Sequence, residues 1–295
     1  MSARTTHGSR PETGRSAVTG AKGFVGRHLV ASLRQAGQSV VELSRASGFD
    51  LLADDLPAGD FSVLYHLAAR TFVPAAWENP VDFHLVNAHG TLRMLEQCRQ
   101  RGIPMVYVSA YIYGSPEALP IPETAPVRLN NPYGYSKFAG EEACRFYAEM
   151  FGVSVSIFRL FNVYGPGQDR HFLIPEIMGQ VGDPDVPEIV LKDLAPKRDY
   201  VHVSDVVDAL LLGRSLKGLN TFNVGSGASI SVGGIVEAIR TVAGSTKPYR
   251  AVGERRPNEV MDVVADISAL LETGHWRPRV SFEDGIRELW KTEFQ

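Results

Sequence analysis

A glycine-rich turn near the N-terminus is the feature that most constrains how this chain can fold. Gly20, Gly23 and Gly26 follow an apolar strand pattern and open a helical one. Gly20 permits a tight turn, Gly23 lets a phosphate approach the backbone, and Gly26 lets helix and strand pack closely. A helix start also offers free N–H donors and a positive dipole end. The pattern predicts a pyrophosphate site, with a tight turn of incidental glycines as the alternative.

The segment that follows favours the dinucleotide. The helical pattern ends near Gly37 and leads to an apolar strand, Val40 to Leu43. Ser44 and Arg45 come next, where an acidic residue would bind the ribose hydroxyls of NAD. A hydroxyl and a guanidinium suit a ribose 2′-phosphate, which a carboxylate would repel. We therefore expect NADP(H), with NAD(H) as second choice; an exposed loop arginine is the alternative for Arg45.

Strands and helices alternate along most of the chain, which predicts an α/β protein with a Rossmann-type, doubly wound parallel sheet. The expected elements are strands at residues 61–67, 105–108 and 154–158, and helices at residues 81–101 and 133–151. Residues 1–15 are polar and lack periodicity, so we expect disorder there.

Composition narrows the class of protein. The chain has 295 residues, 44% of them hydrophobic, and a net charge of −3, so it can bury a large core and carries no excess charge for nucleic acid or membrane. No run is long and apolar enough for a membrane span, and no signal peptide opens the chain, so we expect a cytoplasmic location. Cys98 and Cys144 lie in helical patterns and the histidines lack zinc-binding spacing, so we expect no metal site, and His66 and His202 belong to the core or a site wall.

Tyr133 and Lys137 are the strongest candidates for catalysis. A spacing of four residues puts phenol and ammonium on one face of a helix. A nearby positive charge favours the phenolate and would lower the pKa of the tyrosine, making it an acid–base catalyst. Taken alone, a solvated lysine beside a half-buried tyrosine is the alternative.

Several ordered motifs together resemble the extended short-chain dehydrogenase/reductases, the group that modifies nucleotide-activated sugars. The resemblance runs from about residue 16 to the C-terminus. It is carried by Gly20-x-x-Gly23-x-x-Gly26, Asp50-Leu51, His66-Leu67-Ala68-Ala69, Asn87 within residues 86–91, Ser109 five residues before Gly114, Tyr133-x-x-x-Lys137, and the segments 159–167, 198–206, 222–225 and 265–268.

The resemblance implies roles for these residues. Tyr133 would donate a proton to a sugar carbonyl oxygen, Ser109 would donate a hydrogen bond to the same oxygen, and Lys137 would tune Tyr133 and hold the nicotinamide ribose. Asn87 would order backbone or water near Lys137. The cofactor would be bound by Gly20, Gly23, Phe24, Val25, Gly26, Ser44, Arg45, Asp50, Leu51, Leu67, Ala68, Ala69, Asn87, Tyr133 and Lys137.

A nucleotide-diphosphate sugar would be the partner. Asn162 and Arg198 match family positions that contact the diphosphate, and Arg256 is a weaker candidate; a surface ion pair with Asp199 is the alternative for Arg198. The remaining substrate contacts would come from Thr71, Phe72, Val73, Ser109, Ala110 and Tyr111.

The reaction depends on departures from the family pattern. Dehydratases of the family carry an Asp-Glu pair after the serine, whereas Ala110 and Tyr111 stand here and cannot shuttle a proton in that way. Epimerases usually carry the acidic residue that Ser44 replaces. The segment from His66 to Pro80 looks like the corresponding loop of GDP-4-keto-6-deoxy-D-mannose reductases. These features predict NADPH-dependent reduction of a nucleotide-linked 4-keto-6-deoxy sugar; an NAD-dependent UDP-sugar 4-epimerase and a non-catalytic NADP(H)-binding redox sensor are the alternatives.

The family also suggests the organisation of the chain. We expect a nucleotide domain of residues 16–164 and 198–222, and a substrate lobe of residues 165–197 and 223–295. Homodimers would pair through the helices at 81–101 and 133–151. Their apolar residues could instead face the core: Phe138, Phe146, Tyr147 and Met150.

Overall fold

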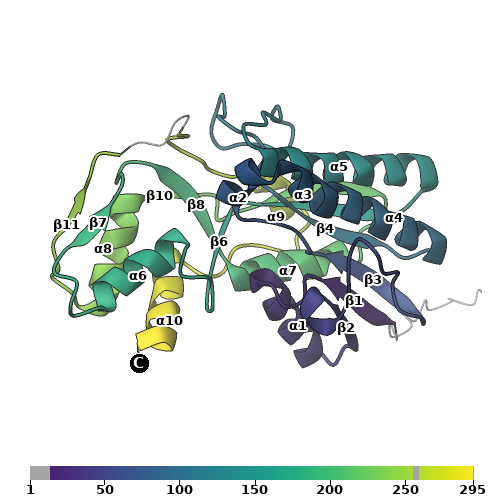
Figure 1. The fold of residues 1–295 in the computed structure, drawn as a ribbon, viewed down its shortest axis with the longest axis horizontal. Helices are drawn as coiled ribbons and strands as arrows, with labels where there is room; N and C mark the ends of the chain where they lie inside the picture. Colours follow the sequence, from purple (N-terminus) through teal and green to yellow (C-terminus); the bar gives the residue numbers. More distant parts are fainter. Residues whose placement is uncertain (1–13, 255–258, 295) are drawn as a thin grey trace, which may run out of the picture.

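A six-stranded parallel sheet forms the centre of the larger lobe in the computed structural model, which describes residues 14–254 and 259–294 (Figure 1). The strand order is β2-β1-β3-β4-β5-β9, so the order reverses between β1 and β3. The strands are β1 (Arg15–Thr19), β2 (Val40–Leu43), β3 (Phe61–His66), β4 (Met105–Ala110), β5 (Val155–Leu160) and β9 (Leu219–Val224). This sheet confirms the predicted α/β Rossmann-type class.

Helices cover both faces of this sheet. Side chains alternate across it, so Val63 and Tyr65 pack with α1 and α7, whereas Leu64 packs with α4 and α5. On the first face lie α1 (Phe24–Gln35) and α7 (Val203–Gly213). The second face carries α3 (Pro80–His84), a π-helical turn (Leu85–His89), α4 (Gly90–Arg101) and α5 (Pro132–Phe151).

A smaller lobe lies beside the sheet and has its own core (Figure 1). Its strands form a three-stranded sheet ordered β10-β8-β6 and a pair, β11-β7. They are β6 (Asn162–Tyr164), β7 (Ile189–Leu191), β8 (Lys197–His202), β10 (Ser229–Ser231) and β11 (Tyr249–Ala251). The helices are α6 (Leu173–Gly182), α8 (Val232–Ala243) and α10 (Phe282–Phe294).

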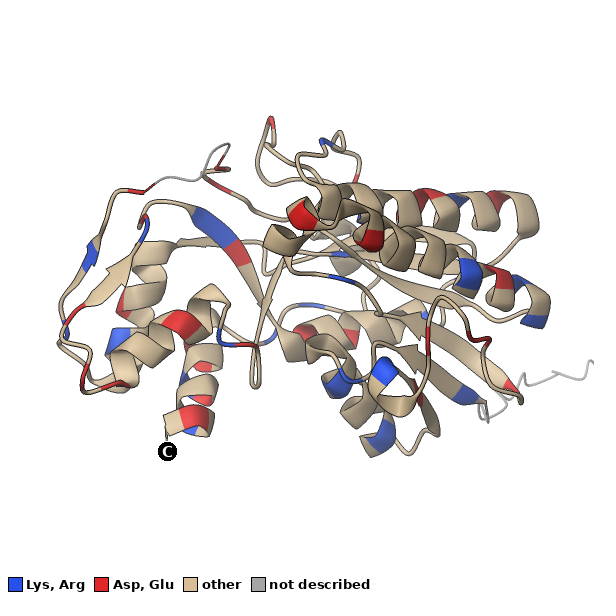
Figure 2. Ribbon diagram, viewed as in Figure 1, with Lys and Arg blue, Asp and Glu red and all other residues tan. Residues whose placement is uncertain are grey.

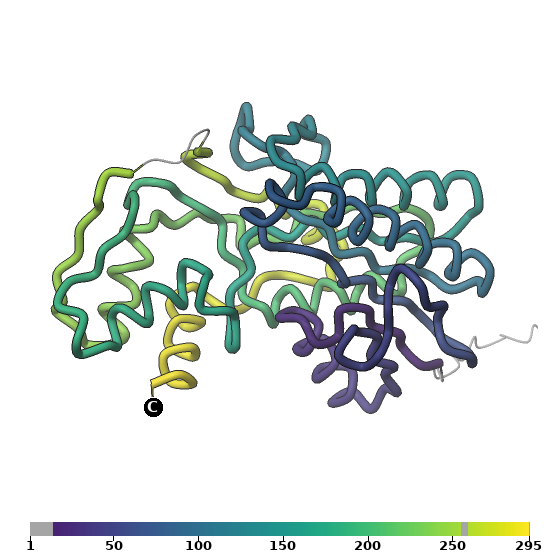
Figure 3. Tube along the Cα trace, viewed as in Figure 1, coloured from purple at the N-terminus to yellow at the C-terminus, as the bar shows by residue number. Residues whose placement is uncertain are grey.

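The chain crosses between the lobes again near its C-terminus (Figure 3). Residues 265–280 run back across the larger lobe, where α9 (Ser268–Leu271) and Trp276 join the core beneath α7. The Trp276 indole N–H donates to the Asp205 carbonyl in α7 at 2.8 Å. This crossing ties the two lobes together.

Several element boundaries differ from the sequence expectations. The expected helix at 81–101 is interrupted by the π-helical turn, and β4 extends to Ala110, so Ser109 lies inside the strand. Arg15, expected in a disordered segment, starts β1, while residues 1–13 lie outside the described residues. The expected domain division stays a prediction; in the structure, β6 and β8 pair with each other and residues 265–280 join the larger lobe.

Charged residues of both signs are interspersed over the two lobes (Figure 2). Within residues 14–254 and 259–294, no helix is long and apolar enough to cross a membrane. No group of three or more His, Cys, Asp or Glu side chains in the same ranges could hold a metal ion.

Candidate active site

The glycine-rich turn lies at the point where the strand order reverses, between β1 and β3. Open α/β sheets bind ligands outside the carboxyl ends of the strands at such a point. Gly20 has a φ of +68°, and a Cβ there would lie 2.7 Å from the Ala68 nitrogen. A Cβ on Gly26 would lie 2.1 Å from the Gly20 carbonyl oxygen. Both positions therefore require glycine for packing.

The start of α1 fits a pyrophosphate. Gly23 caps the helix without a side-chain hydrogen bond, and Phe24 and Val25 form its first turn with Gly26. The first backbone N–H groups of a helix have no partner within it, and the helix dipole adds positive potential. The chain thus presents donors, and no carboxylate in this first turn, to a bound phosphate.

A buried hydrogen-bond chain fixes the two loops that flank this turn. His66, at the end of β3, contacts Thr19 Oγ1 at 2.7 Å through Nδ1 and Thr91 Oγ1 at 3.0 Å through Nε2. The Thr91 hydroxyl donates to the Asn87 carbonyl, so it accepts the Nε2 proton of His66. Burial lowers the pKa of His66 to about 3, which keeps the ring neutral. The Ala68 N–H completes the chain by donating to Thr19, which orders the Leu67-Ala68-Ala69 backbone.

Asn87 links a second loop to the helix that carries Tyr133. It is fully buried in the π-helical turn, a feature frequent at functional sites. Its side chain accepts from the Arg70 N–H at 2.7 Å and donates to the Arg70 carbonyl and to Ser136 Oγ. Ser136 in turn donates to the Tyr133 carbonyl at 2.7 Å. Asn87 orders backbone beside Lys137, as expected.

Tyr133 lies in the first turn of α5, with its ring edge-on to Phe83 of α3 at 6.5 Å between centroids. Asn131 caps this helix by accepting the Gly134 N–H. Burial raises the pKa of Tyr133 to about 12, so the phenol keeps its proton at neutral pH. Burial is the cause of this shift, so the lower pKa expected from the spacing of Tyr133 and Lys137 is not found. A protonated phenol is the acid form that a carbonyl reduction requires.

Lys137 is buried and lies over an aromatic ring. Its Nζ is 4.3 Å from the centroid of the Tyr107 ring on β4, within the range of a cation–π interaction. The Tyr107 hydroxyl donates to the Lys137 carbonyl at 3.2 Å. Burial lowers the pKa of Lys137 to about 8. The sequence analysis missed Tyr107, although its place two residues before Ser109 puts both on the same face of β4.

Ser109 therefore points to the side of the sheet that α5 covers. It is 3% exposed, and its hydroxyl has no hydrogen-bond partner among the described residues. A buried hydroxyl without a partner is costly. A hydroxyl donor without a partner, on the side of the sheet covered by the helix that carries a protonated phenol, fits a carbonyl oxygen.

The region after β2 offers several cations. Ser44 caps a short 3₁₀ turn that begins at Arg45, and its hydroxyl contacts Ser47 Oγ. Glu42, on the same strand, pairs with Lys22 of the glycine-rich turn at 2.5 Å and with Arg34 at 2.6 Å. Those contacts hold the pKa of Glu42 below its usual value. The sequence analysis did not single out Lys22. Further along, Asp50 is exposed and Leu51 packs against Gly90.

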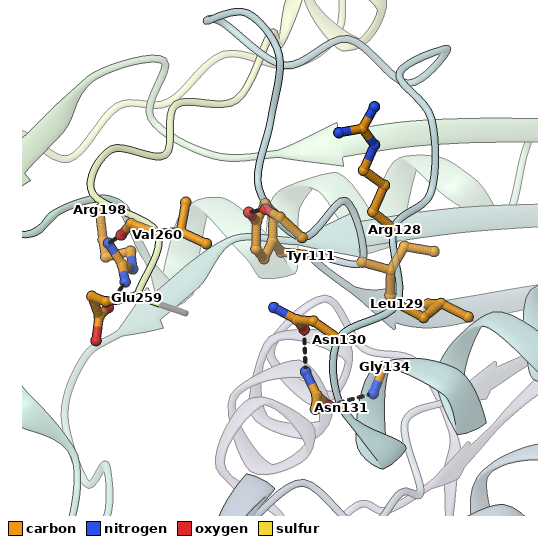
Figure 4. A pocket seen from close by; sticks show the side chains of 11 residues that line it. Tyr111, Arg128, Leu129, Asn130, Asn131, Gly134, Arg198, Glu259 and Val260 are labelled. Carbon is orange, nitrogen blue, oxygen red and sulfur yellow. Dashed lines mark hydrogen bonds and ion pairs between the residues drawn. The ribbon is translucent and has the colours of Figure 1, made fainter. Parts of the chain in front are cut away.

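Arg198 lines a cavity of 270 Å³ between the lobes (Figure 4). Arg198 pairs with Glu259 and donates to the Val260 carbonyl, so the carboxylate that it pairs with is not that of Asp199. Asp199 instead accepts the Ser226, Gly227 and Ala265 N–H groups. No sequence signal pointed to Glu259.

The other substrate candidates have different placements. Asn162 donates to the Asp199 carbonyl at 3.2 Å. Ala110 ends β4 and Tyr111 follows it into the cavity, so no carboxylate stands directly after Ser109. Thr71 is exposed and Phe72 is 55% exposed, just before α2 (Val73–Glu78). Arg256 lies outside the described residues.

A Rossmann sheet with a glycine-rich turn at its switch point, together with the serine, the tyrosine and the lysine described above, is typical of a dinucleotide-dependent enzyme of the short-chain dehydrogenase/reductase type. The profile of the NAD dependent epimerase/dehydratase family matches residues 17–225. The chain belongs to this family, among enzymes that act on nucleotide sugars.

Relatives of known or assigned activity fall into two groups. A GDP-6-deoxy-D-mannose reductase of Pseudomonas aeruginosa is 30% identical over 94% of this chain and 96% of its own. A putative UDP-glucose 4-epimerase of Methanocaldococcus jannaschii is 29% identical over 92% and 96%. The structure of RMD from Pseudomonas aeruginosa complexed with NADPH is similar, with a TM-score of 0.86 at 30% identity over 95% of this chain and 98% of that one. The Thermus thermophilus UDP-glucose 4-epimerase complex with NAD has a TM-score of 0.81, also at 30% identity, over 94% and 98%.

Proposed function

We propose that this protein reduces the keto group of a nucleotide-linked 4-keto-6-deoxy sugar with NADPH. The observation that carries the proposal is the unpartnered, buried Ser109 hydroxyl on the side of the sheet covered by α5, the helix whose Tyr133 phenol stays protonated. The absence of a carboxylate after Ser109 argues against dehydration, which needs an acid and a base there. The similarity to a GDP-6-deoxy-D-mannose reductase supports the same reaction.

Each residue contributes a definite step. Ser109 donates a hydrogen bond to the carbonyl oxygen, where negative charge develops. A bound NADPH supplies the hydride that adds to the carbonyl carbon. Tyr133 transfers its phenolic proton to the oxygen, which yields the alcohol, and takes a proton back from water. Lys137, as an ammonium, favours the transient phenolate, since an opposite charge stabilises it.

NADPH is preferred to NADH in this proposal because cations surround the end of β2. Arg45 follows the strand after Ser44, and Lys22 reaches the same strand from the glycine-rich turn through its contact with Glu42. A ribose 2′-phosphate carries negative charge that a guanidinium binds well. The relative solved with NADPH is consistent with this choice.

Substituting Arg45 tests the cofactor preference. We expect nucleotide-stripped wild type to bind NADPH at least roughly tenfold more tightly than NADH, which corresponds to about 1.4 kcal/mol. Arg45→Ala should weaken NADPH binding by roughly tenfold to a hundredfold, the range of a charge-assisted hydrogen bond, and leave NADH binding within about twofold. Nicotinamide fluorescence titration measures both constants.

Arg287→Ala is the matched control, because Arg287 is an exposed arginine of α10 that pairs with Glu283 and Asp284. It should leave both constants unchanged. Equal affinity of wild type for the two nucleotides would refute the 2′-phosphate site, and tightly held NAD in the purified protein would favour epimerisation.

The reaction itself separates the candidates. A reductase oxidises NADPH when GDP-4-keto-6-deoxy-mannose or another 4-keto nucleotide sugar is added, and absorbance at 340 nm follows this directly. A 4-epimerase is the second candidate because UDP-glucose 4-epimerases are among the relatives. Such an enzyme would convert UDP-galactose without added cofactor. Tight NADPH binding without turnover in either assay would support the redox sensor.

We further propose that two copies pair through α3, α4 and α5, which lie side by side on one face (Figure 1). Apolar side chains are exposed there. Tyr135, Phe146 and Met150 fall on one face of α5, and Met150 is 63% exposed. Val81 of α3 is 70% exposed. Tyr147, expected in the same surface, packs in the core instead.

Analytical ultracentrifugation tests this pairing. Wild type should sediment as a dimer at micromolar concentration, and Val81→Asp/Met150→Asp should sediment as a folded monomer because two carboxylates would be buried unpaired. A wild-type monomer would contradict the pairing. Thr292→Asp, at an exposed position of α10 in the smaller lobe, is the control and should not change the oligomeric state.

A further inference from the structure

The cavity between the lobes has polar ends and an apolar middle (Figure 4). At one end Arg198 and Glu259 pair with each other. At the other, Asn131 caps α5 and donates to Asn130. Arg128, which also lines the cavity, pairs with Glu117. Arg198, Glu259, Asn131 and Arg128 therefore have partners within the protein, and the Asn130 side-chain carbonyl oxygen accepts from Asn131.

Tyr111 stands between these two ends. Its hydroxyl donates to the Gly114 carbonyl, so the phenolic proton is not available to a ligand while that bond exists. Its ring packs against Phe161, with 5.4 Å between centroids, and against Tyr113 at 5.9 Å. The aromatic ring, and not a donor group, is what Tyr111 presents to the cavity.

Two further apolar side chains line the same space. Val260 packs in the small hydrophobic cluster that contains Tyr113 and Phe161, and Tyr111 joins the same cluster. Leu129 lines the cavity from the segment that leads into α5. We define Tyr111, Leu129 and Val260 as the apolar wall.

We propose that the apolar wall makes this site selective for sugars that lack an oxygen at C6, with Tyr111 as the residue that sets the selectivity. This inference rests on the proposed function and on Arg198 as the diphosphate contact that the sequence analysis expects, so that the sugar would lie between Arg198 and the phenol of Tyr133. A methyl group against the wall buries apolar surface. A hydroxymethyl group in the same place would lose hydrogen bonds to water, and the side chains of the wall would offer its oxygen no donor in return, because the Tyr111 hydroxyl proton is engaged with the Gly114 carbonyl.

The size of this effect follows from how apolar pockets discriminate. Such pockets reject an added hydroxyl or a changed methylene by roughly tenfold to two hundredfold. We expect the 6-deoxy sugar to bind at least tenfold more tightly than its 6-hydroxy counterpart. Replacing the ring with a side chain that can pair with the extra hydroxyl should erase most of that ratio.

Binding measurements on the full chain test the inference without turnover. Isothermal titration with saturating NADPH compares GDP-6-deoxy-mannose with GDP-mannose, and UDP-6-deoxyglucose with UDP-glucose; members of each pair differ only in the C6 oxygen. Tyr111→Asn should bring the ratio of dissociation constants to within about threefold of one, whereas Tyr111→Phe, which keeps the ring, should retain it. Val260→Thr adds a hydroxyl to the wall at nearly constant volume and should lower the ratio even if Tyr111→Asn fails to fold.

Equal affinities in wild type for both members of each pair, or an unchanged ratio in folded Tyr111→Asn, would overturn the inference. Failure of the proposed function gives a different result: 6-deoxy selectivity would persist in binding while no 4-keto sugar is reduced. If 4-keto sugars are reduced but the 6-deoxy and 6-hydroxy sugars bind equally well, the proposed function would hold and the role of Tyr111 in selectivity would be wrong.

Discussion

Tyr133→Phe is expected to lose nearly all turnover while the protein stays folded and binds nucleotide. The substitution removes one oxygen, the phenolic oxygen in the first turn of α5 that would give its proton to the carbonyl. General acid catalysis contributes roughly 10²- to 10⁴-fold, so kcat should fall by that factor in the NADPH oxidation assay. The aromatic ring at position 133 would still pack edge-on to Phe83. Its backbone carbonyl would still accept from Ser136, so little stability should be lost.

Tyr135→Phe is the control for this experiment. It makes the same chemical change two residues further along the same helix, on a side chain that is 55% exposed and stacks on His84. Its kcat should match that of wild type. Turnover of Tyr133→Phe within about twofold of wild type would remove Tyr133 from the mechanism, and a loss of NADPH binding would show that the variant acts through the cofactor site.

The parts of the site that sequence alone predicted depend on local geometry. The glycine-rich turn needs a positive φ at Gly20 and a close approach of the backbone at Gly26, so the spacing of the two glycines is enough to predict the turn. Tyr133 and Lys137 share a helix, and Ser109 lies near the carboxyl end of a strand, so an open parallel sheet is expected to bring them to the same edge. The geometry of turns, helices and strands therefore suffices to bring these residues to one edge of the sheet.

The parts that sequence did not predict depend on contacts between distant segments. Arg198 pairs with Glu259, 61 residues away, and no pattern marks that acid as its partner. The expectation for the pKa of Tyr133 considered Lys137 and not the burial that dominates it.

The largest loss of stability is expected from Arg159→Met. Arg159, on β5, is 2% exposed, and its Nη2 lies 2.7 Å from Glu141 of α5, which is fully buried. The same guanidinium donates to the Tyr113 hydroxyl and to the Glu123 carbonyl. Removing one partner of a buried ion pair costs roughly 3–5 kcal/mol, because the other charge stays buried. Urea unfolding should show a loss of about this size in the free energy of unfolding.

Two further variants separate the buried pair from ordinary surface charge. Arg145→Met removes a partly exposed arginine that also contacts Glu141, at 3.2 Å, and should cost less than about 1 kcal/mol. Glu141→Leu/Arg159→Met removes both buried charges and should recover much of the loss, as replacing such pairs by apolar residues often does. A loss below about 1 kcal/mol in Arg159→Met would show that Glu141 is not left uncompensated.

The double variant also tests whether the buried Glu141–Arg159 pair has a role besides stability. Burial lowers the pKa of Lys137, and the charge of Glu141, one helical turn away, opposes that fall. With Glu141→Leu in place, Lys137 should lose its proton at lower pH. The alkaline limb of the kcat/KM profile should therefore shift to lower pH even where stability is recovered. If the alkaline limb of the kcat/KM profile does not shift, the role of Glu141 would be only to hold α5 on the sheet.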